Sequence, residues 1–296
     1  MKVLNFGSMN IDHVFQVAEI VRPGQTIDSL GIEHFPGGKG MNQSVAIARA
    51  GCRVYHAGNI GPDGQELRQL LEEAGADCTW LRTVETGTGS TFIQVDANGQ
   101  NCIVLNGGAN RANTREYCDE VLAHFDAGDL LLLQNEINCV DYLMEKAHEK
   151  GMVVALNPSP MNEKVPACDL SRVSLFIMNE DEGMSITGKQ EPEEILTAMS
   201  ERFPEAQVIL TLGSKGSVYQ GKGRRISQKA YRVKAVDTTA AGDTFTGFLL
   251  AGMARGEDMA ACLDDGARAS AIAVTRMGAT SSIPTLAEVR AAELGE

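Results

Sequence analysis

Residues 236–253 read Val-Asp-Thr-Thr-Ala-Ala-Gly-Asp-Thr-Phe-Thr-Gly-Phe-Leu-Leu-Ala-Gly-Met. In the second half of this stretch, apolar or small residues recur at the spacing of one face of an α-helix: Phe245, Phe248, Leu249, Gly252 and Met253. The pattern predicts a helix that packs on a hydrophobic core. The rest of the chain can be arranged around the start of this helix.

The start of this helix is predicted to bind an anion. Ala240, Ala241 and Gly242 are small enough to let a ligand reach the backbone N–H groups. At a helix N-terminus these groups lack intrahelical acceptors and lie at the positive end of the helix dipole. Asp243 follows directly, and its carboxylate either only caps the helix or takes part in chemistry at this point.

The composition excludes several classes of partner. The chain has 296 residues, enough for one large α/β domain or two smaller ones, and 26 basic against 39 acidic residues give a net charge of −13. This charge argues against binding to nucleic acid or to an anionic membrane surface. An anionic ligand must therefore be held by local groups.

The cysteines and the apolar runs favour a cytoplasmic protein. Seven cysteines are scattered without a Cys-x-x-Cys pair, which is typical of reduced thiols. The first residues lack the apolar run of a signal peptide, and no stretch approaches eighteen apolar residues. We expect a soluble protein of the cytoplasm.

Short apolar runs followed by polar or glycine residues recur along the chain, and they predict buried parallel strands. These runs are residues 3–6, 130–133, 152–156, 176–178 and 208–212. The expected fold is a doubly wound, mainly parallel sheet flanked by helices, which binds ligands at the carboxyl ends of its strands. Asn10 and Asp12 are expected in the loop after the first strand, either as ligand groups or as ordinary turn residues.

Two β-rich segments, residues 13–35 and 89–106, interrupt the α/β pattern. In the second, Asn98-Gly99 is a strong hairpin signal between two runs of β-formers. We expect these segments to form a small β-sheet, either a lid over a site or a hairpin without function. Residues 1–12, 36–88 and 107–296 would then form the α/β domain.

A glycine-rich block, Pro-Gly-Gly-Lys-Gly-Met-Asn-Gln, occupies residues 36–43 and leads into an apolar helix. It has neither the spacing of a P-loop nor that of a dinucleotide fingerprint. Lys39 and Asn42 could donate to a polyhydroxylated substrate or to a phosphate. Two further helix starts are predicted, at Asp63 with Glu66 and at Thr285 with Glu288, from the capping-box spacing.

The motifs together resemble the ribokinase family of sugar kinases over nearly the whole chain. Besides residues 36–43, the likeness rests on Asn-Glu-Asp-Glu (179–182), Thr-Leu-Gly-Ser-Lys-Gly (211–216), Val-Asp-Thr-Thr-Ala-Ala-Gly-Asp-Thr-Phe (236–245) and Ala-Val-Thr-Arg-Met-Gly-Ala (273–279). The resemblance implies ATP-dependent phosphorylation of D-ribose at O5. It also implies Mg²⁺ and a monovalent cation such as K⁺.

The resemblance implies roles for the start of the helix. The N–H groups of Ala241, Gly242 and Asp243, after Ala240, would form an anion hole for the transferred γ-phosphoryl group, and Asp243 would accept the sugar hydroxyl proton. Phosphoryl transfer depends on such positioned donors. Because the helix dipole also stabilises negative charge on Asp243, we expect this carboxylate to orient the hydroxyl first and to take the proton late.

By the same likeness, the residues that match sugar-binding positions are Asn10, Asp12, Gly38, Lys39, Gly40, Asn42 and Glu136. Those that match nucleotide-binding positions are Asn179, Thr211, Gly213, Ser214, Lys215, Gly216 and Gly242. Glu182 matches a carboxylate that holds Mg²⁺ through water, or it is a solvated residue at a helix start. The monovalent-cation positions match Asp237, Thr239, Ala273, Arg276, Gly278 and Ser282. Ala267 departs from the family, which usually has Asn near the adenine.

Several alternatives remain open from the sequence. The substrate could be fructose, 2-deoxyribose or a nucleoside, although Asn10, Asp12 and Glu136 together favour ribose. A non-catalytic sugar-binding relative is disfavoured by Asp243, and a dehydrogenase by the absence of a dinucleotide fingerprint. The exposed face of the β lid predicts a homodimer in which two lids pack together, as the resemblance also implies.

Overall fold

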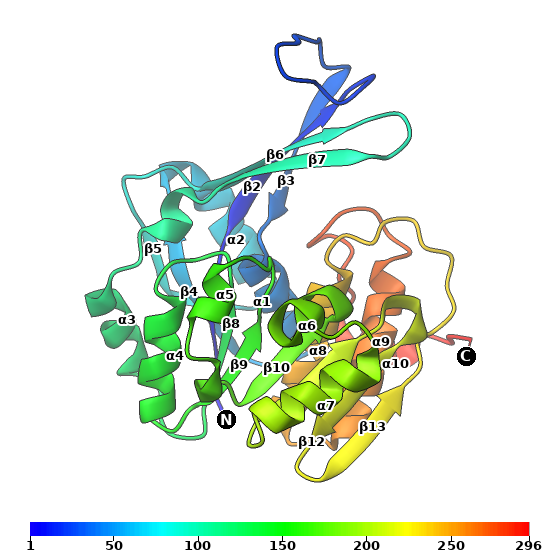
Figure 1. Cartoon of the computed structure of the whole chain (residues 1–296). Helices are drawn as coiled ribbons and strands as arrows, with labels where there is room; N and C mark the ends of the chain where they lie inside the picture. The colour runs from blue at the N-terminus through cyan, green and yellow to red at the C-terminus, as the bar shows by residue number, and fades with distance from the viewer. Residues whose placement is uncertain (296) are drawn as a thin grey trace.

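The computed structural model describes residues 1–295 and contains two β-sheets of different size (Figure 1). The larger sheet has nine strands in the order β13-β12-β11-β10-β9-β8-β1-β4-β5. Their bounds are β1 (Val3–Phe6), β4 (Val54–Ile60), β5 (Asp77–Thr83), β8 (Leu130–Gln134), β9 (Val153–Asn157), β10 (Leu175–Asn179), β11 (Gln207–Thr211), β12 (Ser217–Gly221) and β13 (Arg224–Gln228).

The strand order reverses at the centre of this sheet. From β1 the chain proceeds outward through β4 to β5, whereas from β8 it proceeds in the other direction to β11, and these strands are all parallel. Only β12 and β13 add antiparallel pairs. The predicted doubly wound, mainly parallel sheet is confirmed. Open sheets of this kind bind ligands beside such a reversal, here between β1 and β8.

Helices cover both faces of the large sheet (Figure 1). On one face lie α1 (Lys39–Arg49), α2 (Gln65–Glu73), α8 (Ala241–Arg255), α9 (Met259–Ala273) and α10 (Leu286–Ala291). On the other lie α3 (Arg115–Leu122), α4 (Val140–Glu149), α5 (Lys164–Ala167), α6 (Glu180–Thr187) and α7 (Pro192–Arg202). No helix within residues 1–295 has the length and apolar character needed to cross a membrane.

The sequence of β8 shows why two cores form. Leu130 and Leu132 belong to the core on the α8 side, whereas Leu131 and Leu133 belong to the core on the α4 side. Successive side chains of a strand point to opposite faces, so a strand covered on both faces needs an unbroken apolar run. The all-leucine run therefore specifies a central strand.

The smaller sheet has the strand order β3-β2-β6-β7 and projects from one end of the molecule (Figure 1). Its strands are β2 (Asn10–Gln16), β3 (Gly31–Gly37), β6 (Gly89–Val95) and β7 (Asn101–Asn106). The predicted hairpin between β6 and β7 is confirmed. The prediction that Asn10 and Asp12 lie in a loop is wrong, because both belong to β2, which pairs with β3 and β6 along its length.

One of the two predicted capping boxes forms. Thr285 and Glu288 exchange the expected hydrogen bonds at the start of α10. The prediction for Asp63 is wrong, because α2 begins after Gly64 without a side-chain cap. Asp63 Oδ1 instead accepts from the backbone N–H and the hydroxyl of Thr88, at 2.9 and 2.7 Å. A partner distant in the sequence has replaced the local one.

Helix α8 begins after Ala240, as predicted, and packs closely on α1. A Cβ atom added at Gly247 would lie 2.3 Å from the Cβ of Ala46 and 2.9 Å from the backbone nitrogen of Ile47. A glycine is therefore needed where the two helices approach each other. This contact holds the start of α1 beside the start of α8.

We predict that Gly247→Ala lowers the free energy of unfolding by about 1 to 3 kcal/mol, because overpacking outweighs the better helix propensity of alanine. Urea denaturation measures the change. Gly242→Ala is the matched control in the same helix, since no atom lies within 4 Å of its added Cβ. Equal stability of the two variants would contradict the close-packing argument.

Candidate active site

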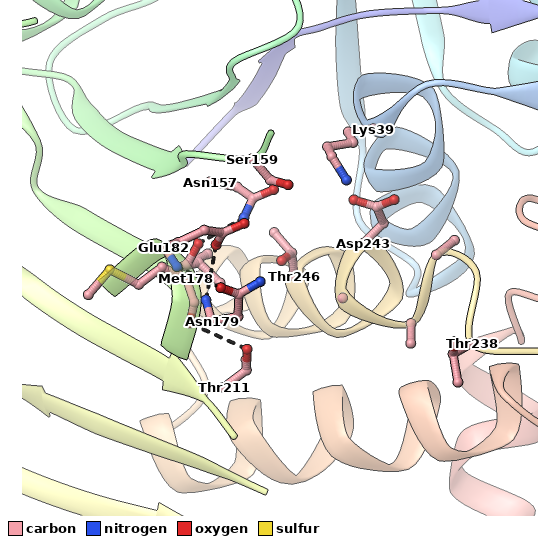
Figure 2. Close-up of a pocket in the computed structure, with 14 residues that line it drawn as sticks. Lys39, Asn157, Ser159, Met178, Asn179, Glu182, Thr211, Thr238, Asp243 and Thr246 are labelled. Atoms are coloured by element: carbon pink, nitrogen blue, oxygen red, sulfur yellow. Dashed lines mark hydrogen bonds between the residues drawn. The ribbon is translucent and has the colours of Figure 1, made fainter. Parts of the chain in front are cut away.

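A cavity of about 220 Å³ lies at the carboxyl ends of β9, β10 and β11, beside the start of α8 (Figure 2). Its wall combines elements that are far apart in the sequence. Eight of its lining residues are candidates from the sequence: Lys39, Asn179, Glu182, Thr211, Ala240, Ala241, Gly242 and Asp243. The catalytic candidates, part of the sugar-binding and nucleotide-binding sets and Glu182 thus share one cavity, whereas the monovalent-cation candidates do not line it.

The start of α8 is open to this cavity. Ala240 has the left-handed conformation with φ of 58°, which is uncommon for a residue other than glycine and stores backbone strain. The N–H of Ala241 donates to Thr238 O at 3.2 Å. Within residues 1–295, the N–H groups of Gly242 and Asp243 donate no backbone hydrogen bond. The anion hole stays a prediction. The N–H groups of Gly242 and Asp243 are better placed for it than that of Ala241, which already has an acceptor.

The Asp243 carboxylate is buried and held on both of its oxygens. Asn42 Nδ2 donates to Oδ2 at 3.0 Å, and Gln43 Nε2 donates to Oδ1 at 2.8 Å. The Lys39 side chain extends toward the same carboxylate (Figure 2), whose charge raises the pKa of the lysine. Gln43 is the contact that the sequence reading missed. Its signal was a second carboxamide directly after Asn42 in the glycine-rich block.

Glu136 connects the glycine-rich block to the end of β8. Its side chain is 8% exposed, and its Oε2 accepts from the backbone N–H of Lys39 at 2.9 Å and from the hydroxyl of Ser8. Burial raises the pKa of this carboxyl. At Gly40, an added Cβ would lie 2.3 Å from Ser8 N, so this glycine allows the close approach of two backbone segments.

Asp12 and Asn10 are each fixed by a partner that the sequence reading did not identify. Thr91 Oγ1 donates to Asp12 Oδ1 at 2.5 Å, and Asn110 Nδ2 donates to Asn10 Oδ1 at 2.7 Å. Burial is the main reason that the pKa of Asp12 rises to about 6, and the nearby Glu136 adds to it. Six sugar-side candidates do not line the described cavity: Asn10, Asp12, Gly38, Gly40, Asn42 and Glu136. Of these, Glu136 and Asn42 contact residues that do, through the backbone N–H of Lys39 and the Asp243 carboxylate.

The nucleotide-side candidates surround the start of α6 and the end of β11. Asn179 caps α6 and exchanges a capping-box pair with Glu182, whose Oε2 accepts from Asn179 N–H at 3.0 Å. Glu182 is 5% exposed, and burial raises its pKa, so it is not a solvated carboxylate. Thr211 lines the cavity, whereas the turn that follows does not: Gly213, Ser214, Lys215 and Gly216.

The monovalent-cation candidates lie on two segments, called the loop pair: residues 237–239 before α8, and residues 273–282, which comprise the last residue of α9 and the loop after it. Asp237 Oδ2 accepts from Gly278 N–H at 2.9 Å, and Oδ1 accepts from Thr239 N–H at 2.9 Å and from its hydroxyl at 2.6 Å. The Arg276 side chain turns away to pair with Glu288 at 2.7 Å. Within residues 1–295, no group of three or more His, Cys, Asp or Glu side chains is placed to hold a metal.

The family model for pfkB family carbohydrate kinases matches residues 1–286. The chain belongs to this family. The ribokinase of Haemophilus influenzae is 35% identical over 295 residues, covering 95% of each chain. The ribokinase of Staphylococcus aureus is 34% identical, covering 97% of this chain and 98% of its own. The expected membership in this family of kinases is confirmed.

Solved structures of pfkB kinases agree with the fold. Ribokinase of Cryptococcus neoformans in complex with ADP superposes with a TM-score of 0.86 at 32% identity and covers 98% of both chains. Ribokinase of Arabidopsis thaliana complexed with ribose and ATP has a TM-score of 0.85 at 28% identity, covering 98% of this chain and 97% of its own. The two sheets and their flanking helices are therefore the arrangement of this family.

We predict that the free energy of unfolding of Asp12→Asn increases relative to that of the unchanged chain as pH rises from about 4 to about 6. A carboxyl whose pKa is raised from 3.8 to about 6 favours the folded state at low pH, and this contribution is lost as pH rises through the folded pKa. The expected difference is about 2 kcal/mol, after allowance for solvent around a partly exposed side chain.

Urea denaturation at several pH values measures this difference. The control is Asp28→Asn, at an exposed carboxylate on a loop, for which the difference from the unchanged chain should stay constant. A constant difference for Asp12→Asn as well would mean that burial does not raise the pKa of Asp12.

Proposed function

We propose that this pfkB kinase transfers the γ-phosphoryl group of ATP to O5 of D-ribose and forms ribose 5-phosphate. The observation that carries the proposal is the position of Asp243. It lies at the open start of α8, in one cavity with Lys39 and with Asn179 and Thr211 of the nucleotide side. The relatives named ribokinase, at 34–35% identity over nearly the whole chain, support ribose as the substrate.

In the proposed reaction, Asp243 accepts the hydroxyl proton as O5 attacks the γ-phosphorus, and the bond from this phosphorus to the β-phosphate oxygen breaks to release ADP. The N–H groups of Gly242 and Asp243 lie where the negative charge of the transferred group would be stabilised. Ala241 would add a third donor if its contact with Thr238 O opened. Lys39, whose pKa is raised chiefly by the charge of Asp243, would supply a positive charge in the same cavity.

The residues present fit the two expected cations. Glu182 keeps one carboxylate oxygen for its cap while its side chain lines the cavity, which suits a Mg²⁺ held through water. Mg²⁺ would neutralise phosphate charge. The loop pair at Asp237 and Gly278 would offer mostly backbone carbonyls, together with Thr239, Ala273, Arg276 and Ser282, to a monovalent cation such as K⁺. Such an ion would strengthen the positive field near α8.

A second candidate substrate is 2-deoxyribose. Deoxyribokinases of Salmonella typhi and Salmonella typhimurium are 28% identical over 295 residues, so proteins this similar include enzymes named for that sugar. Against it, the proposed sugar side carries Asn10, Asp12 and Glu136, each fixed by a partner. Buried polar groups placed for a hydroxyl are left unpaired by an analogue that lacks it, which favours ribose.

We predict that ribose gives the highest kcat/KM in a panel with 2-deoxyribose, fructose and adenosine, at least about 100-fold above 2-deoxyribose. Release of ADP, followed with a coupled assay, measures it. Asp243→Asn should lower kcat by about 1,000-fold or more, with the KM for ribose within a few-fold, because the proton acceptor is lost while the sugar contacts remain.

Each outcome decides one part of the proposal. A different preferred sugar would replace ribose but keep the kinase, and no ADP release with any member of a wide pentose, hexose and nucleoside panel would favour a non-catalytic relative. Full activity of Asp243→Asn would remove the proposed role of Asp243.

We also propose a cytoplasmic homodimer. The support for the compartment is that all seven cysteines are free thiols, as a reducing environment requires. The support for the dimer is that exposed apolar side chains occupy both faces of the small sheet, with exposed fractions from 39% to 61%. The strand register puts Phe35, Ile103 and Leu105 on the face of Asp12, and Ile32, Phe92 and Val104 on the other. A second copy could cover the face that carries Ile103.

We predict that light scattering gives the mass of a dimer, and that Ile103→Lys shifts it toward the monomer, because a charge would then be buried between the sheets. The control is Met184→Lys on α6, an exposed apolar side chain of the large domain that should leave the mass unchanged. A monomeric mass for the unchanged chain would contradict the proposed dimer.

A further inference from the structure

The Asp243 carboxylate depends on two neighbouring residues of α1. Asn42 Nδ2 contacts its Oδ2 at 3.0 Å, and Gln43 Nε2 contacts its Oδ1 at 2.8 Å. Asn42 already belongs to the proposed sugar side, whereas Gln43 has no part in the proposed reaction. With one donor on each oxygen, the carboxylate cannot rotate freely, and each oxygen keeps a lone pair for a further contact.

Contacts on β9 and β10 determine which atom of the Gln43 amide is the nitrogen and which is the oxygen. The backbone carbonyl of Ile177 can only accept, and Asn157 Nδ2 donates to it at 2.9 Å. Asn157 therefore presents its oxygen to Gln43, at 3.1 Å, and the atom of Gln43 that meets it must be the nitrogen. The same nitrogen then faces Asp243.

The direction is fixed independently from the side of β1. The backbone carbonyl of Gly40 accepts from Asn5 Nδ2 at 2.7 Å, so Asn5 presents its oxygen to Gln134 Nε2 at 3.0 Å. Gln134 Nε2 also donates to Gln43 Oε1 at 2.7 Å. The carboxamides of Asn5, Gln134, Gln43 and Asn157 thus form a hydrogen-bonded row between two backbone carbonyls, and both carbonyls require the same orientation of Gln43. The orientation follows from hydrogen-bond chemistry and not from an arbitrary choice between oxygen and nitrogen.

Burial of these hydrogen-bonded carboxamide side chains costs folding stability. Asn5, Gln43 and Gln134 are all fully buried, at 0% exposure, between α1 and the central strands. Gln134 Oε1 is buried without a hydrogen-bond partner within residues 1–295. An unpaired buried acceptor lowers stability, and an apolar residue of the same size would avoid that loss. A contribution to stability alone therefore does not explain why these carboxamide side chains are buried here.

We propose that Gln43 is a positioning residue for phosphoryl transfer, oriented by Gln134, which holds the Asp243 carboxylate in place for the sugar hydroxyl. This inference rests on the proposed function and adds a residue to it. A carboxamide suits the position because it donates without charge. A carboxylate there would compete with Asp243 for one proton, as two neighbouring carboxyl groups do.

The test compares Gln43→Met, Gln43→Glu and Gln134→Met with the unchanged chain, using kcat, KM and the dependence of kcat on pH. Gln43→Met should lower kcat by about 10- to 100-fold with the KM for sugar and for ATP within about threefold, because a donor to the reacting carboxylate is lost. Gln134→Met, which does not touch Asp243, should lower kcat by about three- to tenfold.

Gln43→Glu should move the acidic limb of the kcat profile up by about one pH unit or more, because the two carboxyl groups would share a proton. The matched control is Gln207→Met. Gln207 is a buried carboxamide of β11, at the opposite end of its strand from the cavity, and it accepts from the hydroxyl of Tyr219 at 2.8 Å. This control should lower stability but leave kcat and its pH profile unchanged.

The outcomes separate this proposal from the proposed function. If the unchanged chain phosphorylates no sugar, the proposed function fails and the role of Gln43 fails with it. If the unchanged chain is active and Gln43→Met matches Gln207→Met in kcat, or Gln43→Glu leaves the pH profile in place, only the role of Gln43 is overturned. A fall in stability without these kinetic changes would make Gln43 a purely structural residue.

Discussion

The contact between α1 and α8 is the constraint on which the rest of the site depends. The absence of a side chain at Gly247 lets the backbone of α8 approach Ala46 and Ile47 closely. The starts of the two helices then lie side by side, although they are about two hundred residues apart in the sequence. One start presents Asn42 and Gln43, and the other presents Asp243. The proposed sugar side and phosphate side meet because of this packing.

The electrostatics of the site follow from burial more than from net charge. The chain is strongly acidic, and three acidic side chains of the site, Asp12, Glu136 and Glu182, have pKa values raised by desolvation. The pKa of Lys39 is raised in turn by the charges of Asp243, Glu136 and Glu182. An anionic nucleotide can enter such a surrounding only where preorganised donors compensate for the acidic neighbours. In the proposed function, the N–H groups of Gly242 and Asp243 at the start of α8 would be such donors.

Much of the fold could be predicted because its signals are local. The apolar spacing of residues 245–253 predicted α8, the leucines of β8 predicted a buried parallel strand, and Asn98-Gly99 predicted a hairpin, each within one short window. The partners of the site residues could not be found in this way. Thr91 lies 79 positions from Asp12, and Ser8 lies 128 positions from Glu136. Contacts over such distances depend on the assembled fold.

The two wrong predictions have the same cause. Asp63 has the local spacing of a helix cap, but Thr88 supplies better donors from another part of the chain. Asn10 and Asp12 look like loop residues after a short strand, but they pair with β3 and with β6, which lies far along the chain. A single sequence shows each residue's own preference and not the competing partner that the fold brings to it.

The position of Asp12 on β2 ties this carboxylate to the projecting sheet. Asp12 is part of a strand that is hydrogen-bonded on both sides, so any movement of that sheet would move the carboxylate with it. Asp243, in contrast, belongs to α8, which packs on the large sheet. The two carboxylates of the proposed site are therefore carried by different parts of the fold.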